Sequence, residues 1–483
     1  MLSIGLRILN SNETEPAELR GKNLDIALRL ASEQCLVVGG YLRKPHHMHT
    51  VQAMIILNSF AGWKQENIDQ TWICMGTTIR IALSMGLQRD PACFPDIPPG
   101  DAELRRRVWT QLMCMDILSS IQIGLPTMLK STETDTRPPC NLHDDEITSE
   151  GPLPPERPHS EMTGVSYMIA KTKHAHIYAE IVQSISRISP RPPYTDILRL
   201  EKALEELHQN LPEFLRYKPF SESTSDQSWL ILQRYSLETM FLRGIIMLHR
   251  QFASRSTKNP RYLHSRDRCI RAAMNLLENQ YEMHQAVETR FQRCKWFVNI
   301  YGGSDFLHAA MIVGLHLSMT LGDNFISHGI RVDARGQGPW AGRESDEERR
   351  RMYRMLVRYR EMVRGEPRVD APGCVSKAEM VINVVLERLS NDEVLTREDP
   401  VEEPVQEPVA VEPGPVLAPP VGLRWPGSPP DLEDVGMQEV SMAQEMQGDW
   451  DEWDAFMKGM DLPVDLGPGW GDTGARNNVQ PTW

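Results

Sequence analysis

The sequence predicts an all-α protein, with a large multi-helix domain over residues 1–390 and a disordered acidic tail over residues 391–483. Three observations predict this. Apolar residues recur at three- and four-residue steps through the first part of the chain, which is the period of an amphipathic helix. The hydrophobic fraction of 41% over 483 residues is enough for a sizeable core. From Asn391 the composition changes to proline and acidic residues, which bury too little apolar surface to fold.

The N-terminal part predicts two helices with a histidine-rich loop between them. The first covers residues 24–36, and its shared side contains Leu24, Ala27, Leu28 and Cys35. The loop contains His46, His47 and His49. We interpret these histidines as loop residues rather than metal ligands, because no defined partner set accompanies them. Thr50 is predicted to cap the second helix, VQAMIILNSFAGW.

A helical hairpin is predicted over residues 71–128. Its first helix carries a helical-period series, namely Trp72, Met75, Ile79, Ala82 and Gly86. Its second helix carries another, namely Leu104, Val108, Leu112, Met115 and Ser119. Gly86 with Pro91 ends the first helix, and Gly124 with Pro126 ends the second. The connection is short and rich in proline, so we expect antiparallel neighbours.

Several further helices are predicted after the hairpin. They cover residues 161–188, 194–211, 229–252, 267–278 and 295–318. The last is apolar nearly all round from Phe306, which predicts a place at the centre of the domain. His174 and His176 are two residues apart and therefore point to different sides of their helix. His308 and His316 share only a broad side, so we interpret both as core histidines.

The last predicted helices follow a glycine-rich loop at residues 322–342. One is amphipathic, with an apolar side of Met352, Met355, Leu356, Tyr359, Met362 and Val363. Its other side is basic and contains Arg349, Arg350, Arg351, Arg354, Arg358 and Arg360. We interpret this basic face as a solvated surface, with an import signal or a nucleic-acid contact as the alternative. A short helix over residues 377–389 closes the domain.

The acidic tail contains one segment with a second pattern. At residues 448–466, bulky apolar side chains recur at helical steps between acidic ones, namely Trp450, Trp453, Phe456, Met457 and Met460. Acidic neighbours keep such side chains in water, where a groove on a partner can bind them as the segment folds. This composition is typical of an acidic activation segment. The alternative is a short helix that docks on the parent domain.

Charge and cysteine content limit the partners. Residues 391–483 hold 20 Asp and Glu against 4 Lys and Arg, so the rest of the chain, with a total of −13, is close to neutral at +3. That part offers no strongly basic face for duplex DNA. The 8 cysteines contain no Cys-x-x-Cys, so spacing predicts no zinc site and no cofactor in this chain. Cys74 and Cys114 are predicted to be buried, reduced thiols. No apolar run is long enough to span a bilayer, so no membrane partner is expected.

The hairpin also carries a resemblance. The run TWICMGTTIRIALSMGLQRDP, followed by ELRRRVWTQLMCMD and GLP, resembles the fungal-specific transcription factor regulatory domain of fungal zinc-cluster regulators. The elements MLHRQF, DRCIRAAMNLLE and KWFVNIYGGSDFLHAAMIVGLHLS extend the resemblance over residues 45–320. Gln88 and Leu125 depart from the family, which usually has histidine and arginine there. The signature residues are Trp72, Gly76, Arg80, Gly86, Arg106, Arg107, Trp109, Asp116, Gly124, Pro126, His249 and Arg250. We interpret His249 and Arg250 as a helix-end pair bonded to carbonyls, with lining of an effector pocket as the alternative.

The resemblance implies a nuclear transcriptional regulator of a fungal metabolic or biosynthetic gene set. Its tail would contact the transcription machinery or a coactivator, and it would form a homodimer or a heterodimer with a related regulator. The family reads DNA through an N-terminal zinc cluster, so zinc and DNA are expected only where such a reader is supplied. Three explanations remain for the absence of a zinc cluster from this sequence. The chain is a fragment, it is an isoform that acts through a partner, or it binds DNA by an unfamiliar surface. A cofactor that modulates a partner regulator is therefore the alternative function.

A remote alternative is an all-α magnesium-dependent enzyme. Asp144, Asp145 and Glu146 form an acidic run, as in helical terpene synthases. A magnesium site needs several oxygen ligands that converge, and this run lies in an irregular, proline-rich segment. We therefore do not expect an enzyme.

Overall fold

The computed structural model describes most of the chain before the tail. It describes residues 24–43, 46–62, 68–123, 125–129, 133–148, 151–185, 192–223, 225–256, 259–289, 291, 304–321, 345–365, 377–390 and 395. All regular structure in these ranges is helical, which confirms the predicted all-α class. The loop predicted at residues 322–342 and the tail beyond residue 395 lie outside the described residues.

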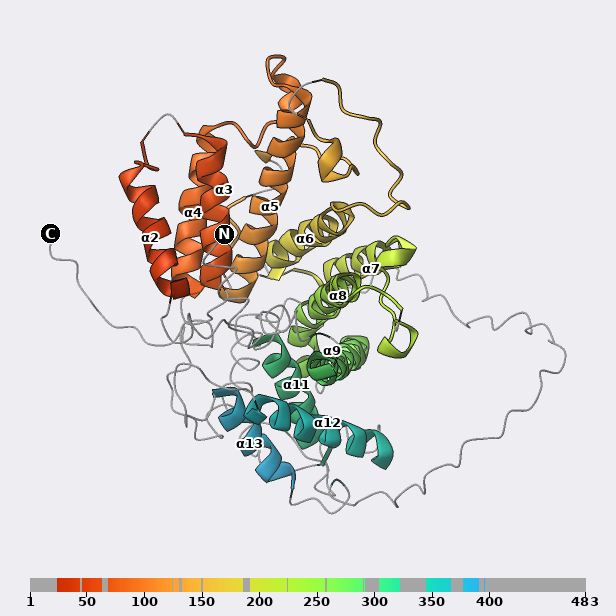
Figure 1. Cartoon of the computed structure of the whole chain (residues 1–483). Coiled ribbons are helices and arrows are strands. Elements are labelled where there is room, and N and C mark those ends of the chain that lie inside the picture. Colours follow the sequence, from red (N-terminus) through yellow and green to blue (C-terminus); the bar gives the residue numbers. More distant parts are fainter. Residues whose placement is uncertain are drawn as a thin grey trace, which may run out of the picture.

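The helices are stacked in chain order (Figure 1). The α-helices are α2 (Leu24–Val38), α3 (Met48–Gly62), α4 (Ile68–Ser84), α5 (Pro99–Ile123), α6 (Ser166–Ile185), α7 (Tyr194–Gln209), α8 (Ser228–Arg255), α9 (Leu263–Thr289), α11 (Ser304–Leu321), α12 (Asp346–Gly365) and α13 (Lys377–Leu389). Helices α2 to α5 form one end of the stack and α12 with α13 the other. Between them α6, α7 and α9 pack against α8, and α11 and α12 pack against α9.

The predicted hairpin is formed by α4 and α5, which pack side by side. The indole Nε1 of Trp72, near the start of α4, donates to Ser120 Oγ near the end of α5 at 3.3 Å, so the two helices are antiparallel. Gly86 follows α4 with a φ of 74°, a left-handed conformation that glycine adopts without strain. The backbone therefore ends α4 where the sequence predicts it.

Two predictions about the buried faces of the hairpin need correction. On α5, Val108 and Leu112 are buried, but the other three predicted positions are not fully buried, because α5 packs against α6 as well as α4. Its buried surface therefore extends round to Trp109. The prediction that Cys74 is buried is wrong, because this thiol lies on the solvent side of α4, whereas Cys114 is buried as predicted.

Two helix starts also differ from the predictions. Thr50 does not cap α3, because the helix begins at Met48 and the Thr50 N–H already donates to His47 O at 3.0 Å. Helix α6 begins at Ser166, five residues later than predicted. Its start is set by Thr163, whose N–H donates to Ser166 Oγ at 2.9 Å in a reciprocal cap. The capping side chains of Thr163 and Ser166 thus place the start of α6 more closely than the apolar period does.

Most of the remaining described helices agree with the predictions, whereas α11 begins at Ser304 and the predicted residues 295–303 lie outside the described residues. Helices α7, α8 and α13 lie within three residues of their predicted bounds, and α9 is longer than predicted. In α11, Phe306 and Leu317 are buried as expected for the centre of the domain. Leu395, beyond the predicted domain boundary at residue 390, is only 3% exposed and belongs to the main core.

Candidate functional site

The carboxylate of Asp90 joins the loop after α4 to α5. Arg106 on α5 donates from Nε to Oδ2 at 3.0 Å and from Nη2 to Oδ1 at 2.9 Å. The backbone N–H groups of Arg137 and Ala92 each donate to this carboxylate at 2.9 Å. Asp90 and Arg106 are both buried, and the guanidinium of Arg106 holds the pKa of Asp90 well below its usual range. The buried ion pair therefore links three segments, namely the loop after α4, helix α5 and the chain at Arg137.

A second buried carboxylate, Glu103, fixes the segment that follows the hairpin. Arg107 donates from Nε to Glu103 Oε1 at 3.0 Å, and the backbone N–H of Cys140 donates to the same oxygen at 3.1 Å. Arg107 also donates to Leu142 O at 3.1 Å and to Asp144 Oδ1 at 2.5 Å. Arg106 and Arg107 thus donate hydrogen bonds to different carboxylates. Through these bonds both arginines hold the irregular chain outside the helices against α5.

Trp109 and Asp116 bond to the chain that precedes this segment. The indole Nε1 of Trp109 donates to Thr134 Oγ1 at 2.9 Å. The Oδ2 atom of Asp116 accepts the backbone N–H groups of Met128 and Leu129, each at 2.9 Å. Burial raises the pKa of Asp116 to about 6, although the two backbone donors oppose this. Asp116 therefore fixes the chain that leaves the hairpin, at Met128 and Leu129, against α5.

The other hairpin signature residues have separate roles. A Cβ on Gly76 would lie 2.9 Å from Met128 Sδ, so glycine permits the chain after α5 to pack closely on α4. Arg80 and Pro126 are exposed, and Gly124 lies outside the described residues. Of the signature residues, those that hold the chain after α5 against the hairpin are Arg106, Arg107, Trp109 and Asp116.

The acidic run behind the enzyme alternative is engaged by arginines. It forms a 3-10 turn, η4 (Asp144–Glu146), in which Asp144 pairs with Arg107. Arg157 donates to both oxygens of Glu146 at 2.5 and 2.6 Å and lowers the pKa of that carboxyl to about 2. In the described part of the chain these carboxylates do not converge as a metal-binding group. Their arrangement gives the magnesium hypothesis no support.

The interpretation of His249 as part of a helix-end pair is wrong. Helix α8 continues past it to Arg255, and the His249 ring is completely buried. Its Nδ1 lies 2.9 Å from Ser265 Oγ on α9, so the ring bonds across helices instead of to terminal carbonyls. Arg250 is exposed. Neither the contact of His249 with Ser265 nor the exposure of Arg250 tests the alternative that these two residues line an effector pocket.

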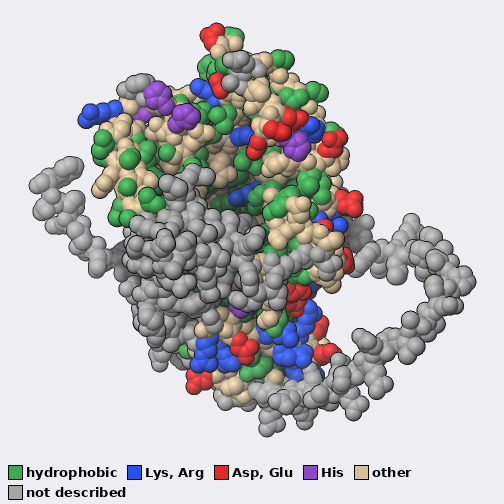
Figure 2. All heavy atoms as spheres, in the orientation of Figure 1, with side chains coloured by type: hydrophobic (Ala, Val, Ile, Leu, Met, Phe, Trp, Pro, Cys, Tyr) green, Lys and Arg blue, Asp and Glu red, His purple; other side chains and the backbone are tan. Residues whose placement is uncertain are grey.

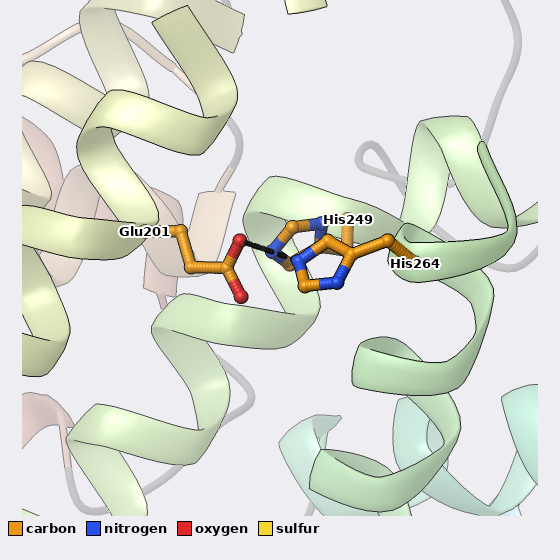
Figure 3. A group of neighbouring side chains, drawn as sticks. All are labelled: Glu201, His249 and His264. Atoms are coloured by element: carbon orange, nitrogen blue, oxygen red, sulfur yellow. Dashed lines mark hydrogen bonds and ion pairs between the residues drawn. The ribbon is translucent and has the colours of Figure 1, made fainter. Parts of the chain in front are cut away.

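His249 belongs to a polar cluster at the junction of α7, α8 and α9 (Figure 3). Glu201 Oε2 lies 2.8 Å from His264 Nε2 and 3.3 Å from His249 Nε2. Arg268 donates from Nε to the other oxygen of Glu201 at 2.6 Å and also pairs with Glu205. Burial alone would raise the pKa of Glu201, but the two imidazoles outweigh burial and lower it. We call Glu201, His249 and His264 the His2Glu cluster.

Sequence reasoning missed this cluster. Its members are 48 and 15 residues apart and lie on three helices, so no local spacing connects them. Only His249 was singled out, through the resemblance. The signal that could have found the cluster is tertiary, because it depends on how α7 and α9 pack against α8.

The other histidines that were weighed as metal ligands in the sequence have these surroundings in the described part of the chain. His46, His47 and His49 form no metal-binding group among the described residues. His174 and His176 point to different sides, as predicted. Their Nδ1 atoms lie 3.0 Å and 2.9 Å from backbone carbonyl oxygens one turn earlier, so both rings bond to their own helix.

The basic side of α12 is partly used within the fold. Arg351 pairs with Glu278 on α9 at 2.7 Å, and the guanidinium of Arg358 lies 4.9 Å from the ring centroid of Tyr281 on the same helix. Figure 2 shows Lys and Arg side chains gathered at this end of the molecule, with acidic side chains among them. These contacts agree with the interpretation of a solvated face that also packs on α9.

The predicted activation segment at residues 448–466 lies outside the described residues, so Trp450, Trp453, Phe456, Met457 and Met460 have no structural account. Within the described part of the chain, no helix is both long enough and apolar enough to cross a bilayer.

Comparison with known proteins identifies the helical region. Residues 1–211, which contain the hairpin and its buried ties, match the fungal specific transcription factor domain. Residues 1–211 thus resemble a fungal specific transcription factor domain. The match confirms the resemblance predicted from the signature, and this domain also contributes Glu201 to the His2Glu cluster. No solved structure matches the chain.

Relatives of the chain are named as transcription factors. The Zn(2)-C6 fungal-type transcription factor pigI of Monascus ruber is 32% identical over 294 residues, which cover 60% of this chain and 36% of the relative. The Zn(2)-C6 fungal-type transcription factor mpsB of Macrophomina phaseolina is 31% identical, covering 59% and 39%. The equisetin cluster transcription factor eqxF of Fusarium heterosporum is 31% identical, covering 61% and 42%. The chain thus spans about two fifths of the length of these relatives.

Proposed function

We propose that the protein is a nuclear transcriptional regulator of a fungal metabolic or biosynthetic gene set. The observation that carries the proposal is the fungal specific transcription factor domain over residues 1–211. Relatives named for the equisetin and pyrrolocin clusters support a biosynthetic gene set. The same names support regulation rather than catalysis, and the arginine-paired acidic run at Asp144 and Glu146 supports this too.

The folded region would act as a regulatory domain that does not itself read DNA. The chain outside residues 391–483 has a net charge of only +3, whereas duplex binding rests on many phosphate contacts from Lys and Arg. DNA binding would therefore come from a zinc-cluster reader, either in the same polypeptide or in a related regulator that forms a dimer with this chain. The zinc expected from that reader would be bound outside the domain described here.

The tail would recruit the transcription machinery or a coactivator. Its Trp450, Trp453 and Phe456 lie at helical steps among acidic residues. Such a segment stays soluble because of its charge and folds when its apolar side chains enter a groove on a partner. The binding energy of this kind of contact is concentrated in a few large apolar anchors.

Fusion of residues 391–483 to a heterologous DNA-binding domain is expected to activate a reporter gene. Replacement of Trp450, Trp453 and Phe456 by alanine is expected to remove most of that activation, because all three anchors are lost together. The matched control replaces Leu423, Trp425 and Trp470, which lie in the same tail outside residues 448–466, and should activate like the parent fusion. Equal activation by the anchor variant and the parent would contradict this role, provided that both fusions accumulate to the same level.

A further inference from the structure

The His2Glu cluster brings three metal-ligating atoms together from three helices. Glu201 lies on α7, His249 on α8 and His264 at the start of α9. Glu201 Oε2 and the two Nε2 atoms lie within 4.8 Å of one another, and Figure 3 shows the side chains pointing toward a common point. Two imidazole nitrogens with one carboxylate oxygen form a donor set that zinc commonly binds in proteins.

The buried ring of His249 gives a second, independent indication. Its side chain is 0% exposed, and its Nε2 forms no hydrogen bond of good geometry among the described residues, although it lies 3.3 Å from Glu201 Oε2. Its Nδ1 lies 2.9 Å from Ser265 Oγ, and that hydroxyl lies 2.8 Å from the hydroxyl of Tyr194. A metal-bound histidine usually donates its other ring N–H to an oxygen in this way. Without a metal, Nε2 pairs with Glu201 Oε2 at 3.3 Å; in the tautomer with the proton on Nδ1, the Nε2 lone pair and that oxygen can bind one cation instead.

We propose that Glu201, His249 and His264 bind one zinc ion. Bonds of about 2.0–2.1 Å in a tetrahedral site place neighbouring ligand atoms about 3.3 Å apart. The separation between Glu201 and His249 is 3.3 Å, whereas that between Glu201 and His264 is 2.8 Å and must lengthen. The His264 side chain is 51% exposed, so it has room for this shift and leaves a path for the metal. Water would complete the site as the fourth ligand.

The ligand atoms and the neighbouring charges favour zinc over magnesium or calcium. Arg268 occupies the other oxygen of Glu201, so the carboxylate offers Oε2 alone, and Glu205 offsets the charge of Arg268. Magnesium and calcium prefer sets of oxygen ligands, which this site lacks. The zinc ion would hold α7 against α8 and α9. It would thereby link residues 1–211, which match the family domain, to the helices that follow them.

This proposal is tested by zinc titration of the metal-stripped full chain. A chromophoric chelator that competes for zinc should report binding by the parent protein, and zinc should raise its melting temperature. His264→Ala and Glu201→Gln should each weaken this binding at least tenfold and abolish the rise. His159→Ala is the matched control, because His159 is an exposed histidine outside the cluster, and it should behave like the parent.

Because His249→Ala would leave a cavity in the core, the half-exposed His264 is the decisive position. Circular dichroism of each variant without zinc should match that of the parent. Cobalt(II) should also bind the parent, with the intense visible absorption of a four-coordinate site that His264→Ala removes. Absence of zinc binding to the parent would overturn the proposal. So would parent-like zinc affinity in both His264→Ala and Glu201→Gln, since the metal would then bind elsewhere, for example at exposed thiols.

Discussion

Replacement of Arg106 by alanine is expected to lower the free energy of unfolding by about 3–5 kcal/mol, because the buried carboxylate of Asp90 loses its buried counter-ion and keeps only the exposed Arg137. Arg106 donates two hydrogen bonds to Asp90, and both side chains are less than a tenth exposed. Neither water nor the exposed Arg137 can fully compensate the charge of Asp90 in that place, so the fold is destabilised. Chemical denaturation of the purified chain, monitored by circular dichroism, measures the change.

Arg137 provides the matched control for this prediction. It pairs with the same carboxylate at 3.2 Å, but its side chain is 65% exposed. Its ion pair is screened by water, so Arg137→Ala is expected to cost only about 0–1 kcal/mol. Equal losses of stability for Arg106→Ala and Arg137→Ala would show that burial does not set the strength of the ion pairs to Asp90.

The same pair predicts sensitivity to acid. The pKa of Asp90 is lowered in the folded protein, so the folded state binds fewer protons at this site than the unfolded chain. The stabilisation by Asp90 is therefore complete above the ordinary pKa of an aspartate, about 4, and is lost as the pH falls below that value. Arg106→Ala should flatten this acid limb of the stability profile.

Replacement of Asp116 by alanine is expected to destabilise the protein by about 2–4 kcal/mol, because two backbone N–H groups lose their acceptor. Those groups belong to Met128 and to the buried Leu129. Asp116→Asn keeps an acceptor oxygen in the same place and is the matched control, with an expected change below about 1 kcal/mol near pH 7. Denaturation curves of the three proteins at one pH distinguish lost hydrogen bonds from lost charge.

Asp116 also predicts a pH effect opposite in sign to that of Asp90. Its pKa is about 6 in the folded protein, above the ordinary value of 3.8, so the folded state binds the proton more tightly. Its contribution to stability is therefore fully present below about pH 4 and is lost as the pH rises through about 6. Asp116→Asn should remove this decline. A decline that persists unchanged in Asp116→Asn would assign it to another group.

The hairpin could be predicted from the sequence because its signals are local. Gly86 ends α4 through a positive φ, and apolar steps such as Met75 and Ile79 define the buried side of that helix. Cys74 shows the limit of this reasoning. An apolar residue on a helix can face solvent, and only the packing partner decides which side is covered.

The polar contacts could not be predicted, since they depend on distances between remote segments. The resemblance identified Arg106 and Asp116 as signature residues, but not their partners 16 and 12 residues away. For His249, the predicted helix end lay too early, and the ring contacts α7 and α9 instead. Glu201 and His264 gave no sequence signal, because the His2Glu cluster is assembled only when three helices pack together.

A role in transcriptional regulation is tested by transcription from a promoter to which the whole chain is tethered. The full 483-residue protein, fused to a heterologous DNA-binding domain in a fungal host, is expected to change reporter transcription relative to that DNA-binding domain alone. Deletion of residues 391–483 should remove the activating part of this effect. Reporter output that stays at the level of the DNA-binding domain alone, with the fusion present in the nucleus, would contradict a role in transcriptional regulation.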